Sequence, residues 1–256
     1  MDNPLVALAA ALDGLVRRHI FAQPMAKAFA LSAYAEAEDS GEGEVFSRTL
    51  HHVHEPRLRR MIERHQEDER RHARVLRERR DALGLPALPV PDSLALVQRL
   101  SDAAGGVLDK PMATDAEIAD AWALLYAIEE RALDEFKRSG EALAAAGDDE
   151  TSALFFQIRK DEERHLRYCQ AVGRTYDPDF DARIARMRAV ELRTYGAQSR
   201  AWTRYQLDSG FLSLPAWLDL VVRSMTTIGG WLGLPALDPV VETRVREGER
   251  QIALAA

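Results

Sequence analysis

The sequence predicts an all-α protein. Its 256 residues are 46% apolar and 29% charged, and alanine, leucine, arginine and glutamate, which are good helix formers, are prominent throughout. Apolar residues recur at helical spacing over long segments, which are separated by stretches that contain proline or glycine. A chain of this length can form one large domain or two small ones and can bury a sizeable core.

The N-terminal segments are predicted to be helical. Residues 4–22 repeat apolar positions at helical spacing, so we assign residues 1–23 to a separate leading helix. The next helix is expected at about 24–52, with a kink or a break within SGEGE at 40–44, because glycine weakens a helix. A further helix, at about 55–82, ends before GLPALPVP, since proline cannot continue it.

The proline-rich stretch begins a long crossover that contains a predicted helix at 92–104. Two more helices are predicted at 114–145 and 149–173, separated by AAAGDDETS, whose glycine and aspartates are typical of a loop. These helices complete a predicted bundle over residues 24–175. A fifth long helix is expected at 178–210.

The C-terminal part, residues 176–256, is predicted to be a helical extension that packs on the bundle or on a partner subunit. Its segment 212–237 is the most apolar in the chain, yet Asp219, Arg223 and a Gly-Gly pair make it a poor membrane span. We expect this segment to contact the core or to form the interface of a homodimer. Contact with a membrane surface or with another partner is the alternative interpretation.

The composition argues against several kinds of partner and site. A formal net charge of −7 argues against nucleic acid as a partner. The single cysteine, Cys169, excludes an internal disulfide and any site built from four cysteines. The N-terminal sequence has an early aspartate and no basic start, which makes it a poor signal peptide, so we expect a cytoplasmic protein.

One motif occurs twice in the sequence. DERRH at 68–72 and DEERH at 161–165 each carry a glutamate that is followed three residues later by a histidine. Residues three apart share a face of a helix, so each pair can direct a carboxylate and an imidazole at one metal ion. Two such pairs on different helices, each joined by a glutamate from another helix, form the two-metal carboxylate site of some helix bundles.

The repeat extends beyond the two motifs. A shift of 93 residues aligns Asp68 with Asp161, Glu69 with Glu162, Arg71 with Arg164, His72 with His165 and Arg74 with Arg167. The same shift aligns Glu36 with Glu129, and each of these lies after an apolar stretch and 33 residues before the glutamate of its motif. A repeat that preserves candidate ligands together with their setting indicates a shared structural role.

The expected turns agree with this pairing. The midpoint between Glu129 and Glu162 falls inside AAAGDDETS, and the midpoint between Glu36 and Glu69 falls just before Pro56, which suits the first turn of a helix. Each pair of helices can therefore close as an antiparallel hairpin that brings its two glutamates level.

With these residues the chain resembles the ferritin-like superfamily, most nearly its rubrerythrin-type branch, over about residues 25–173. The residues that carry the resemblance are Glu36, Glu69, His72, Glu129, Glu162 and His165. The resemblance implies a four-helix bundle of two antiparallel hairpins joined by a long crossover, holding two iron ions, with a manganese–iron pair as an alternative. It also implies that Glu69 and Glu162 bridge the metals, that Glu36 and Glu129 are terminal ligands, and that His72 and His165 supply one imidazole each.

The function that the resemblance implies is that of a non-haem di-iron oxidoreductase reacting with dioxygen or hydrogen peroxide. The chain lacks the cysteine-rich relay domain that many rubrerythrins carry, and Ala132 stands where they have a further glutamate. Electrons would therefore come from an external donor protein, and peroxide reduction is the less favoured reaction. A small organic substrate is a further expectation, in a pocket walled by the C-terminal third.

Two other functions are consistent with the same ligands. One is ferrous oxidation and iron handling, although a cage-forming ferritin subunit is generally shorter. The other is a membrane-surface hydroxylase acting on a quinone precursor, which would require segment 212–237 to bind lipid.

Several neighbours of the expected ligands are candidates for supporting roles. Asp68 and Asp161 precede the two motif glutamates and can orient the histidine of the opposite helix. His65 lies one turn before Glu69 and could be an extra ligand or could support one, and Tyr126 lies one turn before Glu129. On the first helix only the repeat selects Glu36, so Glu38 stays open as its alternative.

Overall fold

The computed structural model describes residues 4–39 and 42–231, and throughout this part of the chain the secondary structure is helical. The α-helices are α1 (Pro4–Ala22), α2 (Pro24–Asp39), α3 (Glu42–His52), α4 (Pro56–Ala82), α5 (Leu96–Ala103), α6 (Asp115–Ala145), α7 (Asp149–Tyr176), α8 (Phe180–Asp208) and α9 (Ala216–Trp231), and two short 3-10 helices are η1 (Asp92–Leu94) and η2 (Val107–Asp109). The prediction of an all-α protein is confirmed.

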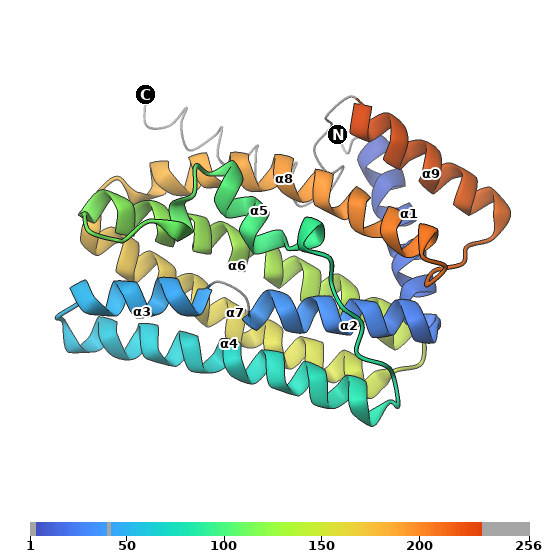
Figure 1. Ribbon diagram of the computed structural model, residues 1–256, viewed down its shortest axis with the longest axis horizontal. Coiled ribbons are helices and arrows are strands. Elements are labelled where there is room, and N and C mark those ends of the chain that lie inside the picture. The colour runs from blue at the N-terminus through green and yellow to red at the C-terminus, as the bar shows by residue number, and fades with distance from the viewer. Residues whose placement is uncertain (1–3, 40–41, 232–256) are drawn as a thin grey trace.

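The helices form two hairpins that pack against each other (Figure 1). Helices α2 and α3 lie end to end along α4, α6 pairs with α7, and α4 contacts α7. The crossover from α4 to α6 carries η1, α5 and η2. Helix α8 covers α6, while α1 and α9 lie at one end of the molecule.

The predicted helix boundaries hold with two differences. The expected helix at 24–52 is described as α2 and α3, and residues 40–41 between them, where the kink or break is expected, lie outside the described residues. The expected helix at 92–104 is divided into η1 and α5, because Ala95 between them adopts an extended conformation with φ −72° and ψ 101°. The sequence around Ala95 gave no sign of this interruption.

Side-chain caps set the two hairpin turns, which span residues 53–55 and 146–148. At the start of α4 the Glu55 carboxylate accepts hydrogen bonds from the backbone N–H groups of Arg57 and Leu58, and Pro56 occupies the first helical position. At the start of α7 the Asp148 carboxylate accepts one from Thr151, at 3.1 Å. Each cap satisfies backbone donors that the first helical turn leaves unpaired.

Two apolar clusters fill the interior and leave a polar layer between them. The first includes Val45, Phe46, Ile62, Trp122, Val172 and Phe180. The second includes Leu31, Leu76, Phe136, Phe155, Leu207 and Leu218. Along α4, Ile62 belongs to the first cluster and Leu76 to the second, so the residues between them cross the middle of the bundle.

A buried ion pair joins α8 to α6. Arg131 donates hydrogen bonds from Nε and Nη2 to the two carboxylate oxygens of Glu191, at 2.8 and 3.1 Å, and these side chains are only 3% and 4% exposed. The guanidinium also lies over the ring of Tyr195, 4.1 Å from its centroid. Both carboxylate oxygens of Glu191 accept a hydrogen bond from Arg131, and buried charges require such pairing.

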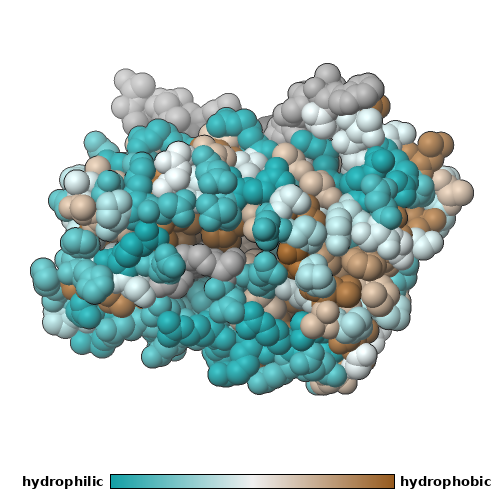
Figure 2. Space-filling view, viewed as in Figure 1, coloured by the Kyte–Doolittle hydropathy of each residue, from teal (hydrophilic) through white to brown (hydrophobic). Residues whose placement is uncertain are grey.

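The C-terminal segment packs on one face only. Leu218 and Val222 of α9 are buried in the second apolar cluster, whereas Trp217, Leu220, Met225 and Ile228 are exposed. Figure 2 shows more apolar surface at the end of the molecule that carries α1 and α9 than over α4, which is largely hydrophilic. None of the helices in the described residues is long and apolar enough to cross a membrane. Residues 232–237, the last part of the apolar segment 212–237, lie outside the described residues.

We expect Glu191→Ala to destabilise the protein by about 3–5 kcal/mol, because the substitution leaves Arg131 charged and buried without this carboxylate. Urea unfolding measures the change. The matched control is Asp181→Asn, which removes an Arg174–Asp181 pair between α7 and α8 whose side chains are 53% and 70% exposed. That control should change the free energy of unfolding by less than about 1 kcal/mol. Equal effects of the two substitutions would contradict the prediction.

Candidate metal centre

Helix α4 presents three metal-ligating side chains on one face. His65, Glu69 and His72 are four and three residues apart, a spacing that aligns them along a helix. All three are buried, and both histidines are fully so. They occupy the polar layer between the two apolar clusters.

The other helices add four side chains to this layer. Helix α7 supplies Glu162 and His165, helix α6 supplies Glu129, and all three are buried. Helix α2 supplies Glu38 from its last turn, with 9% of its side chain exposed. Four carboxylates and three imidazoles therefore meet inside the bundle.

The first group of ligand atoms comes from His65, Glu69, Glu129 and His165, and one atom of each lies within 4.8 Å of the others. The Nε2 atom of His65 lies 2.7 Å from Oε1 of Glu129 and 3.4 Å from Oε1 of Glu69. The Nδ1 atom of His165 lies 3.0 Å from the same Glu69 oxygen. The rings of His65 and His165 stack, with centroids 3.8 Å apart.

The second group comes from Glu38, Glu69, His72 and Glu162, again within 4.8 Å. The Nδ1 atom of His72 lies 3.0 Å from Glu38 Oε2 and 3.3 Å from Glu162 Oε1. Glu69 belongs to both groups. Glu162 also contacts the first group, since its Oε2 atom lies 3.0 Å from Nδ1 of His165.

A ring of two aspartates and two arginines supports the histidines. Arg71 donates hydrogen bonds to Asp68 and Asp161, at 2.6 and 2.8 Å, and Arg164 donates to the same two aspartates, at 2.5 and 2.7 Å. We call these four residues the Asp–Arg ring. Each aspartate also faces the outer nitrogen of the histidine on the opposite helix, so the ring fixes the orientation of both imidazoles. The Nε2 atom of His72 lies 3.3 Å from Asp161, and that of His165 lies 3.5 Å from Asp68.

Burial, neighbouring carboxylates and hydrogen bonds from the histidines shift the pKa values of the carboxylates in opposite directions. Burial raises the pKa of Glu38 to about 8, and the neighbouring Glu69 carboxylate adds to the rise. Burial and the Glu129 carboxylate raise the pKa of Glu162 well above its usual range. Burial also opposes ionisation of Glu69, but hydrogen bonds from His165 and His65 outweigh it and lower the pKa of Glu69 to about 2. In the metal-free protein Glu38 and Glu162 therefore favour the protonated form, whereas a bound cation would relieve the repulsion between the carboxylates.

The donor atoms fit a pair of divalent metal ions. Among the described residues, Glu162 Oε1, which faces Nδ1 of His72 at 3.3 Å, is a carboxylate oxygen buried without a hydrogen-bond partner. A buried carboxylate oxygen without a partner is costly, and ion coordination would satisfy it. Carboxylate oxygen combined with imidazole nitrogen is a donor set that suits iron and manganese.

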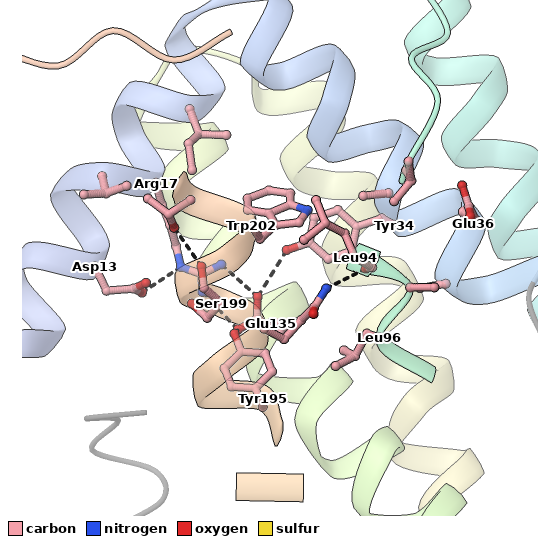
Figure 3. A pocket seen from close by; sticks show the side chains of 18 residues that line it. Asp13, Arg17, Tyr34, Glu36, Leu94, Leu96, Glu135, Tyr195, Ser199 and Trp202 are labelled. Atoms are coloured by element: carbon pink, nitrogen blue, oxygen red, sulfur yellow. Dashed lines mark hydrogen bonds and ion pairs between the residues drawn. The ribbon is translucent and has the colours of Figure 1, made fainter. Parts of the chain in front are cut away.

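Glu36 does not lie with the other predicted ligands. It is exposed, and it lines a separate pocket to which none of the seven side chains of the centre contributes (Figure 3). Glu38, two residues further, faces His72 instead. The repeat selects Glu36 only by its spacing from Glu69, whereas the packing of α2 on α4 places Glu38, the alternative that the sequence left open, in the second group.

A helical stripe could have identified Glu38. Leu31 and Ala35 lie seven and three residues before it, on the same face, and both are fully buried or nearly so. Of the supporting candidates, Asp68 and Asp161 face the histidines, and His65 belongs to the first group. Tyr126 does not join the centre, because its ring packs on the first apolar cluster with the Arg188 guanidinium 5.5 Å from its centroid.

Comparison with known proteins adds no relative: no protein-family model, curated protein or solved structure matches this chain. The interpretation of the centre therefore depends on its own geometry and chemistry.

We expect the metal-free protein to lose stability as pH rises from about 5 to about 8. In this range folded Glu38 holds a proton that the unfolded chain, with a pKa near 4.5, has released, so raising the pH favours unfolding. His72 also has a raised pKa, from its bond to Glu38 and despite burial, and acts in the same direction. Urea unfolding in the presence of a chelator should show a decrease on the order of 2 kcal/mol.

Glu38→Gln should flatten this dependence, since glutamine keeps the shape and does not titrate. Glu36→Gln, a matched change on the same helix, should flatten it less, because Glu36 is more exposed and its pKa, raised by burial and by Asp92, lacks the effect of the Glu69 carboxylate. An identical slope for wild type and Glu38→Gln would show that another group is responsible.

Proposed function

We propose that this protein holds a pair of iron ions in a ferritin-like four-helix bundle and is an oxidoreductase that reacts with dioxygen or peroxide. The observation that carries the proposal is the pair of four-residue groups that share Glu69 at the centre of the bundle. A carboxylate shared between two sets of ligands can bridge two adjacent metal ions, as in the di-metal carboxylate bundles.

The ligand assignment follows the two groups. His65, Glu129 and His165 would hold one ion, and Glu38 and His72 would hold the other. Glu69 belongs to both groups, and Glu162 contacts His72 of the second group and His165 of the first, which supports bridging roles for these two carboxylates. Glu38 takes the role that the resemblance implied for Glu36, and His65 adds a third imidazole.

When bound, two reducing ions side by side supply the two electrons that dioxygen or peroxide needs in one reaction. The protein holds its histidines in fixed orientations through the Asp–Arg ring, and it excludes water because the ligands are nearly all buried. In the metal-free protein Glu38 holds a proton at its carboxylate, with a pKa of about 8, and it would release that proton on binding the ion. Electrons would come from an external donor protein.

Burial of the centre favours small reactants. None of its seven side chains lines the described pocket that the C-terminal helix α8 helps to wall. The same observation supports ferrous oxidation and iron handling as the second candidate function, because that reaction needs only ferrous ion and dioxygen.

We expect about two irons per chain after anaerobic loading with ferrous ion, measured by plasma mass spectrometry after desalting. Glu69→Ala and Glu162→Ala should each lose most of this iron, because each substitution removes a carboxylate that faces both groups. Circular dichroism should show that these variants remain folded. A wild-type chain that retains no transition metal would remove the basis of the proposal.

The pair Glu38→Gln and Glu36→Gln separates the two candidate ligands on α2. Glu38→Gln should retain about one iron per chain or bind the second at least tenfold more weakly, while Glu36→Gln should match wild type. The reverse result would restore the register predicted from the repeat.

Exposure of the loaded protein to dioxygen distinguishes the two functions. For an oxidoreductase we expect the oxidised iron to remain at about two per chain after gel filtration and to undergo repeated reduction and reoxidation. Iron handling predicts instead that further ferrous ion is oxidised and that many irons accumulate or leave the chain. Spectroscopic titration and metal analysis measure both.

A further inference from the structure

A pocket lies apart from the metal centre, and none of the seven side chains of the centre lines it (Figure 3). Residues of α1, α2, α6 and α8 and of the crossover around η1 line it, so it exists only because the C-terminal and N-terminal helices cover the bundle. Its volume is about 150 Å³. A cavity of about 150 Å³ in another protein accommodates benzene, so this space matches a single six-membered ring.

The walls of this pocket are apolar and include one large aromatic ring. Val16 and Ile20 come from α1, Leu94 and Leu96 from the crossover, and Trp202 from α8. Such walls favour an apolar body that can pack on an indole.

One side of the pocket is a hydrogen-bonded network around Glu135. Arg17 donates two hydrogen bonds to this carboxylate, at 2.9 and 3.0 Å, and Arg138 donates one at 2.7 Å. The hydroxyl groups of Tyr34 and Tyr195 donate to it as well. Glu135 has about four acceptor sites, so these donors occupy it fully.

Most hydrogen-bond donors of the network already have acceptors within the protein. Four of the five N–H groups of Arg17 bond to Glu135, Asp13 and Ser139. Arg17 is the single cationic side chain among the described residues that line the pocket. The atoms left for a ligand are mainly acceptors, namely the second carboxylate oxygen of Asp13 and the lone pairs of the Tyr34, Tyr195 and Ser199 hydroxyls.

We propose that this pocket binds a small, uncharged molecule of about one aromatic ring that carries a hydrogen-bond donor, such as a hydroxyl group. The ring packs between Trp202 and the aliphatic walls, and its donor faces the tyrosine hydroxyls and Asp13. An anionic molecule is disfavoured, because Arg17 is already neutralised by Glu135 and Asp13. Binding depends on side chains that do not belong to the metal centre, so it is independent of the proposed iron site.

Phenol is the probe, titrated by calorimetry into the full-length protein stripped of metal with a chelator. We expect one phenol per chain. Anisole, which keeps the ring and the oxygen but lacks the donor, should bind about tenfold more weakly, a difference equivalent to one hydrogen bond. Benzoate should bind at least tenfold more weakly than phenol. Equal or tighter binding of anisole or benzoate would overturn the assigned ligand chemistry.

Ser199→Phe places a ring in the pocket and should abolish phenol binding. The matched control is Ser209→Phe, the same substitution at an exposed position just beyond α8, which should bind phenol as wild type does. Unchanged binding by Ser199→Phe would overturn the proposal.

Nuclear magnetic resonance of the wild-type protein tests the location without relying on the folding of a variant. Phenol should shift the indole N–H signal of Trp202 and leave that of the exposed Trp217 unchanged. A shift confined to Trp217 would place binding on the exposed face of α9 and would refute the pocket.

Discussion

The interaction on which the rest of the structure depends is the convergence of four carboxylates and three imidazoles in the middle of an apolar bundle. Buried charges are costly unless they are paired, and here the pairing extends outward from the histidines to the Asp–Arg ring. The two apolar clusters lie on either side of this layer and supply the hydrophobic stabilisation that the layer itself lacks. A cation bound between the carboxylates would relieve their repulsion, so ion binding would also stabilise the fold.

Much of this layer could be predicted from the sequence because its residues are local or repeated. The pairs Glu69/His72 and Glu162/His165 follow directly from helical spacing, and the apolar setting of Glu129 indicated that it is buried. The two hairpin turns could be located from loop residues and from the midpoint between paired glutamates. In each case the physical signal lies within one helix or within one turn, where residue spacing determines geometry.

The features that the sequence did not predict depend on contacts between separate helices. The repeat gives Glu36 by its spacing from Glu69, whereas the packing of α2 on α4 directs Glu38 toward His72. The pocket beside Trp202 could not be predicted from the sequence either. Its network joins residues more than a hundred positions apart in the chain, namely Asp13 and Arg17 with Glu135 and Tyr195. Such contacts follow from how α1 and α8 pack on α6, and spacing within one helix carries no information about them.

The sequence repeat is not a true symmetry at the centre. A shift of 93 residues places Ile158 opposite His65, and Ile158 is buried in the second apolar cluster. The first group therefore has two imidazoles and two carboxylates, and the second has one imidazole and three carboxylates. Nitrogen-rich sites favour metals later in the first transition row, whereas oxygen-rich sites favour harder ions such as manganese. Two different metals bound in this centre would therefore occupy defined positions, with the harder ion beside Glu38 and His72. The difference between His65 in one half of the chain and Ile158 in the other would decide which metal occupies which position.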